Sequence, residues 1–252
     1  MKTMQADTLN IQIYDSRQAM GQAAASDISA KIQALLAEKE SINMIFAAAP
    51  SQNEVLAALV ADKAIQWEQI NAFHMDEYVN LSSEAPQGFA NFLRRGLFGQ
   101  VHFKSVNCLN CEAVDPQAEC NRYAALLAAN PTDIVVLGIG ENGHIAFNDP
   151  WVADFNDSQA VKIVPLDDVC RQQQVNDGCF DTIDAVPTHA MTLTIPTLVK
   201  APNLFCIVPA ATKAKAVKET VCGPISADCP ASIMRQHGGA TLYLDEESGA
   251  LL

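Results

Sequence analysis

The chain of 252 residues is long enough for one large or two small domains, and its composition excludes several classes of protein. Apolar residues make up 49% and charged residues 18%, a balance not found in disordered, collagen-like or low-complexity chains. The formal net charge of −13 repels polyanions, so we expect neither a nucleic acid nor a membrane surface as partner. An anionic substrate would therefore need local cations or backbone amides.

Neither a membrane span nor a signal peptide is indicated, because no apolar run approaches about 18 residues and the first seven residues lack an apolar core. We therefore expect a cytoplasmic protein, whose eight cysteines stay as thiols. Cys108 and Cys111 form a CxxC motif without a second pair, which we interpret as a strand end. The histidines have no metal-binding spacing, so we predict no metal.

Short apolar runs alternate along the chain with longer amphipathic ones. We predict strands at Ile11–Tyr14, Ile42–Ala47, Ala72–Met75, Asp133–Gly138, Val161–Val164, Leu204–Val208 and Thr241–Leu244, and helices at Ser16–Glu40, Asn53–Ala61, Gly88–Gly99, Pro116–Ala129, Leu166–Val175 and Thr212–Val221. This alternation predicts an α/β fold: a mostly parallel sheet flanked by helices, as a Rossmann-like open αβα sandwich. No linker divides the chain, so we expect residues 1–252 to form a single domain.

Ligands of such sheets bind at the carboxyl ends of the strands, which directs attention to the loops that follow them. After the strand Ile42–Ala47, Ser51 and Glu54 have the spacing of a capping box, which predicts Ser51 as the N-cap of the next helix. The free N–H groups of that helix would bind an anion. The alternative is an ordinary strand-to-helix turn.

A pair of carboxylates follows the strand Ala72–Met75. Asp76 and Glu77 point to opposite faces if the strand continues, so they cannot form a facing acid–base pair. One of them can still act as a base at the strand end, and the polar segment 79–86 after them is consistent with a loop over a site. The alternative for Asp76 is a solvated carboxylate.

The strand Asp133–Gly138 leads into a glycine-rich loop. Gly138, Gly140 and Gly143 satisfy G-x-G-x-x-G, but we reject a dinucleotide site because the following Asn-Asp-Pro would break its helix. We interpret the glycines as allowing close approach of a small ligand. His144 and Asp149 lie about one helical turn apart in this interpretation and can form a proton shuttle. The alternative is a core histidine.

The segments 73–79 and 137–150 resemble the two signature segments of the glucosamine-6-phosphate deaminase and 6-phosphogluconolactonase family, and are more similar to the deaminases. The similarity continues through residues 186–192, 208–214 and 230–237 in order, so it covers nearly the whole chain. The resemblance implies an isomerising deaminase of glucosamine 6-phosphate. The sugar ring opens, a proton moves from C2 to C1, and hydrolysis of the imine gives fructose 6-phosphate and ammonia, without a cofactor.

The resemblance also implies roles for individual residues. Asp76 matches the base for the C2 proton, His144 the histidine of ring opening, and Asp149 its acidic partner, which is usually glutamate. Asn142, also in the catalytic group, stands where many members have aspartate. The substrate and its phosphate are expected at Ser51, Gln52, Asn53, Gly140, Arg171 and Lys213, of which the last two supply charge.

Three alternatives stay open. The turn Ala48–Asn53 replaces a Gly/Thr-rich turn of the family, which leaves room for another amino sugar phosphate, such as galactosamine 6-phosphate. A 6-phosphogluconolactonase is the second alternative, and a non-catalytic sugar-phosphate sensor is the third. In each case the expected partner is a small sugar phosphate, with a homo-oligomer possible.

Overall fold

The computed structural model describes residues 1–176 and 178–252, and its centre is an eight-stranded sheet. The strands of this sheet are β1 (Lys2–Ala6), β2 (Leu9–Tyr14), β3 (Ile42–Phe46), β4 (Ile70–His74), β6 (Ser105–Asn107), β7 (Ile134–Leu137), β10 (Asn203–Val208) and β11 (Ala240–Asp245). They lie in the order β1-β2-β11-β10-β7-β3-β4-β6, and every neighbouring pair except β1 and β2 is parallel. The predicted mostly parallel α/β fold is confirmed.

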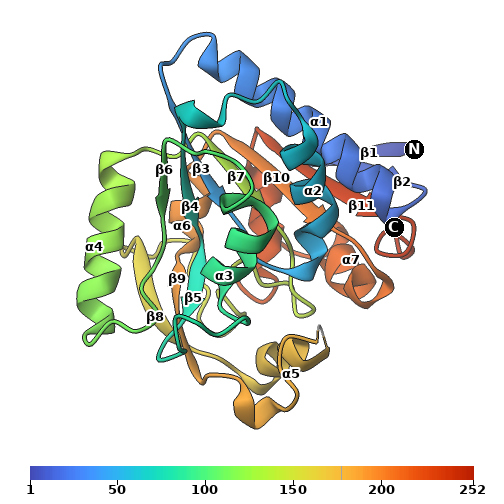
Figure 1. Ribbon diagram of the computed structural model, residues 1–252. Helices are drawn as coiled ribbons and strands as arrows, with labels where there is room; N and C mark the ends of the chain where they lie inside the picture. Colours follow the sequence, from blue (N-terminus) through green and yellow to red (C-terminus); the bar gives the residue numbers. More distant parts are fainter. Residues whose placement is uncertain (177) are drawn as a thin grey trace.

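Helices cover both faces of this sheet (Figure 1). One face is covered by α1 (Arg17–Leu36), α2 (Asn53–Ala61) and α3 (Phe89–Leu93), which continues as a π-helix over Arg94–Phe98; the other is covered by α4 (Pro116–Ala129), α6 (Ile195–Val199) and α7 (Ala214–Cys222). The bounds of α2 and α4 are those predicted from the sequence. α1 begins after its predicted start, because Ser16 is its N-cap and accepts a hydrogen bond from the Ala19 N–H.

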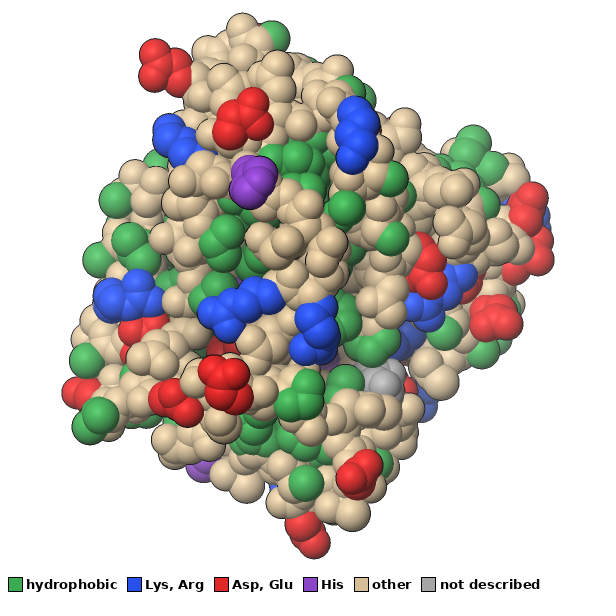
Figure 2. Space-filling view, viewed as in Figure 1, with side chains coloured by type: hydrophobic (Ala, Val, Ile, Leu, Met, Phe, Trp, Pro, Cys, Tyr) green, Lys and Arg blue, Asp and Glu red, His purple; other side chains and the backbone are tan. Residues whose placement is uncertain are grey.

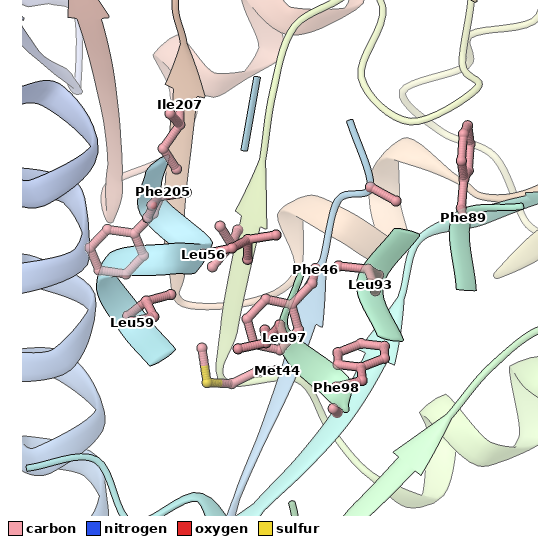
Figure 3. Packing of buried hydrophobic residues seen from close by; sticks show 14 of the residues in the cluster. Met44, Phe46, Leu56, Leu59, Phe89, Leu93, Leu97, Phe98, Phe205 and Ile207 are labelled. Carbon is pink, nitrogen blue, oxygen red and sulfur yellow. The ribbon is translucent and has the colours of Figure 1, made fainter. Parts of the chain in front are cut away.

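The sheet is buried on both faces, which explains why its central strands are apolar throughout. Met44 and Phe46 of β3 pack into one core, whereas Ile45 between them packs into the other. Figure 3 shows the first of these cores, to which Leu56 from α2 and Leu93 from α3 contribute together with Phe46 from β3.

A second sheet of three antiparallel strands, which the sequence analysis did not separate, lies beside the first. It consists of β5 (Asp76–Tyr78), β9 (His189–Leu193) and β8 (Val161–Pro165), in the order β5-β9-β8. The predicted strand Val161–Val164 therefore exists but belongs to this smaller sheet. β5 follows β4 after Met75 alone, and α5 (Asp168–Asn176) lies at the lower edge of the view in Figure 1.

The face shown in Figure 2 has a mixed charge pattern, in which acidic and basic side chains are interspersed among polar and apolar surface. Among the described residues, no helix is both long and apolar enough to cross a membrane.

Candidate active site

A cavity opens at the carboxyl ends of four neighbouring central strands, β10, β7, β3 and β4. Its lining combines apolar side chains with a few polar and charged ones, which suits a small-molecule site. Its lining is formed by Arg17, Ala47, Ala48, Ala49, Pro50, Ser51, Gln52, Met75, Asp76, Phe89, Gly138, Ile139, Gly140, His144, Ala146, Phe147, Gln173, Gln174, Pro209, Ala210, Thr212 and Lys213. Most of these residues lie in the loops that follow the four strands, where an α/β sheet is expected to bind its ligand.

The turn after β3 forms one wall, but its geometry differs from the predicted capping box. Residues Pro50–Gln52 form a 3₁₀ turn, α2 begins at Asn53, and no side chain caps that helix. Ser51 is therefore not an N-cap, and the carboxylate of Glu54 lies 2.7 Å from the guanidinium of Arg17 instead. The capping-box prediction was wrong, because the 3₁₀ turn begins at Pro50 and Ser51 lies inside it rather than before the helix.

The buried amide of Gln52 fixes this turn to the sheet. Its Nε2 donates to the Ile207 carbonyl (3.2 Å) and to Ser51 Oγ (3.0 Å). A Cβ on Gly138 would lie 3.1 Å from that Nε2, so glycine lets the loops after β3 and β7 approach closely. Ser51 and Gln52 line the cavity as expected, whereas Asn53 is exposed and lies outside the lining.

The loop after β10 positions Lys213 at the cavity, and it contains a residue with a strained backbone conformation. Ala210 has φ +81° and ψ 147°, a conformation in which L-residues are rare. Its N–H donates to both carboxylate oxygens of Asp245 (3.0 and 3.2 Å), and Asp245 in turn accepts from the Ser248 N–H (2.8 Å). The following 3₁₀ turn Ala211–Lys213 leads into α7, which places the buried Lys213 at the cavity wall.

Asp76 begins β5 and lies in the cavity with only 6% of its surface exposed. Burial raises the pKa of Asp76 well above its usual range; the Glu77 carboxylate adds to this rise, and the Phe147 N–H opposes it. Glu77 points away from the cavity and accepts from the N–H groups of Phe89 (3.0 Å) and Ala90 (2.9 Å) at the start of α3. The prediction that the two carboxylates face opposite ways is confirmed.

His144 reaches the cavity from the loop after β7, and not from a helix. No helix follows Gly143, which agrees with the rejection of a dinucleotide site, but the proposed helical turn between His144 and Asp149 is absent as well. The loop folds back on itself instead, with Gly143 at φ +86° and Ala146 at φ +49°. Loop curvature, rather than helical spacing, brings the two side chains together.

Three polar side chains of this loop form a hydrogen-bonded relay. His144 Nδ1 lies 3.0 Å from Asp149 Oδ1 and 2.7 Å from Asn142 Oδ1, and Asn142 Nδ2 donates to Asp149 Oδ1 (2.8 Å). Both partners of Nδ1 are acceptor oxygens, so in the neutral imidazole Nδ1 carries the ring proton and Nε2 is the acceptor nitrogen. Burial acts to raise the pKa of Asp149, but hydrogen bonds from His144 and Asn142 outweigh it and hold that pKa below its usual value.

The backbone of Gly140 packs against the imidazole ring of His144. A Cβ at this position would lie 2.1 Å from His144 Cε1 and 2.3 Å from both ring nitrogens. The ring therefore rests on the backbone of Gly140, and only glycine leaves room for it. The Gly140 N–H also donates to the His144 carbonyl (2.9 Å), which closes the loop.

The structure separates Arg171 from the other expected substrate-binding residues. Its guanidinium donates to the carbonyls of Ile183 (2.6 Å) and Val186 (3.2 Å) and pairs with Asp168 (3.3 Å), and it is not part of the cavity lining. Arg171 therefore binds the backbone of the segment that follows α5, and nothing in the sequence indicated this contact.

Sequence reasoning missed four polar residues that line the cavity: Arg17, Gln173, Gln174 and Thr212. Arg17 comes from the start of α1, far from any signature segment, so no sequence signal pointed to it. The two glutamines follow Arg171 on the same helix and take the cavity-facing positions that were expected of it. Gln173 Oε1 also accepts from the Glu141 N–H (3.0 Å).

A group of possible metal ligands lies behind the cavity wall. Atoms of His144, Asp149 and the buried Cys170 lie within 4.8 Å of one another, although the sequence spacing gave no such group. His144 Nδ1 and the near oxygen of Asp149 are already engaged with each other and with Asn142. The group is therefore better suited to hold a proton than a cation, and the absence of a metal stays a prediction.

Comparison with known proteins identifies the family. The family described as glucosamine-6-phosphate isomerases/6-phosphogluconolactonase matches residues 15–243. The chain is 35% identical over 211 residues to a glucosamine-6-phosphate deaminase of Listeria innocua, covering 84% of this chain and 88% of that protein. It is 36% identical over 220 residues to a glucosamine-6-phosphate deaminase of Bacillus cereus, covering 87% and 82%.

Solved structures agree with this assignment. A monomeric glucosamine-6-phosphate deaminase superposes with a TM-score of 0.86 at 29% identity, covering 96% of this chain and 99% of that one. A 6-phosphogluconolactonase of Thermotoga maritima has the same fold, with a TM-score of 0.77 at 18% identity and coverage of 94% and 99%. The chain belongs to the glucosamine-6-phosphate isomerase/6-phosphogluconolactonase family, as the resemblance of its two signature segments predicted.

Proposed function

We propose that the protein is an isomerising deaminase that converts glucosamine 6-phosphate to fructose 6-phosphate and ammonia. The observation that carries the proposal is the buried carboxyl of Asp76 in the same cavity as His144, whose Nδ1 contacts Asp149 and Asn142 outside the cavity lining. The deaminases of Listeria innocua and Bacillus cereus, at 35–36% identity over more than four-fifths of the chain, support the same activity.

Asp76 is the base for the proton at C2 of the open-chain sugar. Removing that proton gives an enolamine, and returning it to C1 gives an imine at C2, which water hydrolyses to the ketone and ammonia. One carboxylate can serve both transfers if water is kept away from it, and Asp76 is almost fully buried. Its raised pKa makes it a stronger base than an exposed aspartate, while its protonated form remains able to return the proton.

His144 serves the preceding step, the opening of the pyranose ring. The free Nε2 takes the proton of the anomeric hydroxyl, and the imidazolium formed can give a proton to the ring oxygen. The Asp149 carboxylate next to Nδ1 stabilises that imidazolium and fixes the ring orientation. The 3.0 Å distance indicates that aspartate, one methylene shorter than the family's usual glutamate, suffices for this contact.

The phosphate lies at the end of the cavity formed by the turn Pro50–Gln52 and Lys213. Both this turn and Ala211–Lys213 lead directly into helices, and the start of a helix favours a bound anion. Lys213 adds a positive charge to this part of the cavity wall.

The test is ammonia release by the purified protein from glucosamine 6-phosphate, with galactosamine 6-phosphate, unphosphorylated glucosamine and 6-phosphogluconolactone alongside. We expect release from glucosamine 6-phosphate and little from the other two amino sugars. Release from galactosamine 6-phosphate alone would identify the other epimer as substrate. Lactone hydrolysis without ammonia release would refute the deaminase assignment.

Two variants separate the steps. Asp76→Asn should abolish turnover and leave binding of the sugar phosphate in place, because the amide keeps the shape but cannot take the C2 proton. His144→Gln should mainly slow the opening of the closed sugar ring. A pre-steady-state lag in product formation would reveal this slower step. Near-normal turnover by Asp76→Asn would refute its role as the base.

A further inference from the structure

We propose that Arg17 is the second cation of the phosphate subsite and that, with Lys213, it makes the site selective for phosphorylated sugars. The inference rests on the proposed function, which it deepens by assigning to the first residue of α1 a role expected of Arg171. Arg17 belongs to no signature segment and lies 34 residues before the nearest residue of the phosphate turn that was expected to bind substrate.

The cavity lining supports this assignment. Among the described lining residues, only Arg17 and Lys213 carry a positive charge. Arg171, the other expected cation, is held by the carbonyls of Ile183 and Val186 outside the lining. A phosphate monoester carries nearly two negative charges near pH 7, and Asp76 in the same cavity adds another. Lys213 alone leaves this charge only partly compensated.

Close packing of two helices brings Arg17 to the phosphate turn. A Cβ on Gly21 would lie 2.5 Å from Glu54 Cβ, so the glycine lets α1 approach the start of α2. The first turn of α1 thereby lies beside residues Pro50–Gln52. Its start is fixed by the Ser16 side chain, which caps the helix.

The guanidinium of Arg17 is held in place on one side only. Its Nε lies 2.7 Å from Glu54 Oε1, and its Nη2 donates to the Pro50 carbonyl. Glu54 is not part of the cavity lining, so it orients the arginine without facing the ligand. With 36% of its side chain exposed, Arg17 keeps donors available to an anion, and a planar fork fixed in this way suits two phosphate oxygens.

The first experiment measures steady-state kinetics with glucosamine 6-phosphate for the wild type and Arg17→Gln. We expect KM to rise about 10-fold, the effect of losing one partly exposed charge-assisted contact, with kcat within about twofold. Arg17→Lys should give an intermediate KM, because it keeps the charge but loses the fork. An unchanged KM in Arg17→Gln would overturn the proposal.

Glu54→Gln separates a direct contact from a structural effect. This variant breaks the same ion pair but keeps the positive charge of Arg17 in the cavity. If Arg17 binds phosphate, Glu54→Gln should keep KM equal to or below that of the wild type. If Arg17 only fastens α1 to α2, Glu54→Gln should raise KM as much as Arg17→Gln does, and the proposal fails.

Arg235→Gln is the matched control. Arg235 has the same kinds of partner, the Asp7 carboxylate (2.7 Å) and the Gly223 carbonyl, but does not line the cavity. Its loss changes the net charge equally and should leave KM unchanged. An equal rise of KM in Arg235→Gln would show that the effect comes from overall charge and would overturn the assignment.

Calorimetric binding of glucose 6-phosphate and inorganic phosphate keeps this test independent of turnover. If the wild type releases no ammonia, the proposed function fails, but weaker binding of both probes by Arg17→Gln would still support the phosphate contact. Equal affinity of the wild type and Arg17→Gln for both probes would refute it, whatever the activity.

Discussion

Replacing Gly140 with alanine tests whether the position of the His144 ring controls the reaction. An added Cβ would come within 2.1–2.3 Å of three ring atoms, whereas ordinary contacts begin at about 3.4 Å, so the ring must move by more than 1 Å. The displaced ring would lose the 3.0 Å contact of Nδ1 with Asp149. A shift of about 1 Å in a catalytic group typically costs about 100-fold in rate, or about 2.7 kcal/mol in activation free energy.

The assay is ammonia release under saturating glucosamine 6-phosphate, with thermal melting to verify that Gly140→Ala is folded. We expect kcat to fall by about 100-fold with a smaller change in KM, because the phosphate end of the cavity is untouched. Gly238→Ala is the matched control, since a Cβ there meets nothing within 4 Å. A folded Gly140→Ala variant with kcat within threefold of the wild type would refute the placement of His144 in the reaction.

Three further predictions follow from buried groups. Burial raises the pKa of Asp76 in the folded state, so ionisation of its carboxyl destabilises the fold as pH rises above about 4, the pKa of aspartate in the unfolded chain. Asp76→Asn should therefore be more stable than the wild type at pH 7. Urea titrations should show that this difference in the free energy of unfolding shrinks as pH falls towards about 4. For the same reason, the acid limb of kcat/KM in the wild type should lie above the ordinary aspartate pKa of about 3.9, and a limb at or below that value would contradict the raised pKa. Tyr123→Phe should lower the free energy of unfolding by about 2 kcal/mol with little change in KM. The variant loses a hydroxyl that donates to the carbonyls of His74 and Asn107 and accepts from the His74 N–H. Denaturant melts measure this loss.

Much of the main sheet could be predicted because its signals are local. The apolar strands around Met44 and Val135 are buried on both faces, so their composition alone marks them. Four strands were missed: β1, β5, β6 and β9. β1 lies at an edge with most of its residues exposed, β5 and β6 have only three residues each, and Thr192 interrupts the short apolar run of β9.

The candidate site was only partly predictable for a related reason. Asp76, His144 and the turn at Ser51 and Gln52 lie in the segments that follow strands of the sheet, and the parallel order of those strands brings their ends together. Arg171 was misplaced because a residue type shows the charge but not the direction of the side chain. Arg17 was missed because its contact with the cavity depends on how α1 packs against α2.

The sequence by itself determined the alternation of strands and helices, the family, and the carboxylate and histidine at the strand ends, because strand periodicity and signature segments are encoded in neighbouring residues. Only the tertiary structure decided that His144 and Asp149 meet through a folded loop, that Asp76 is buried with a raised pKa, and that Arg17 faces the cavity. Distances, burial and pKa values depend on groups that are remote in the chain, so they are fixed only when the sheet and its helices pack together.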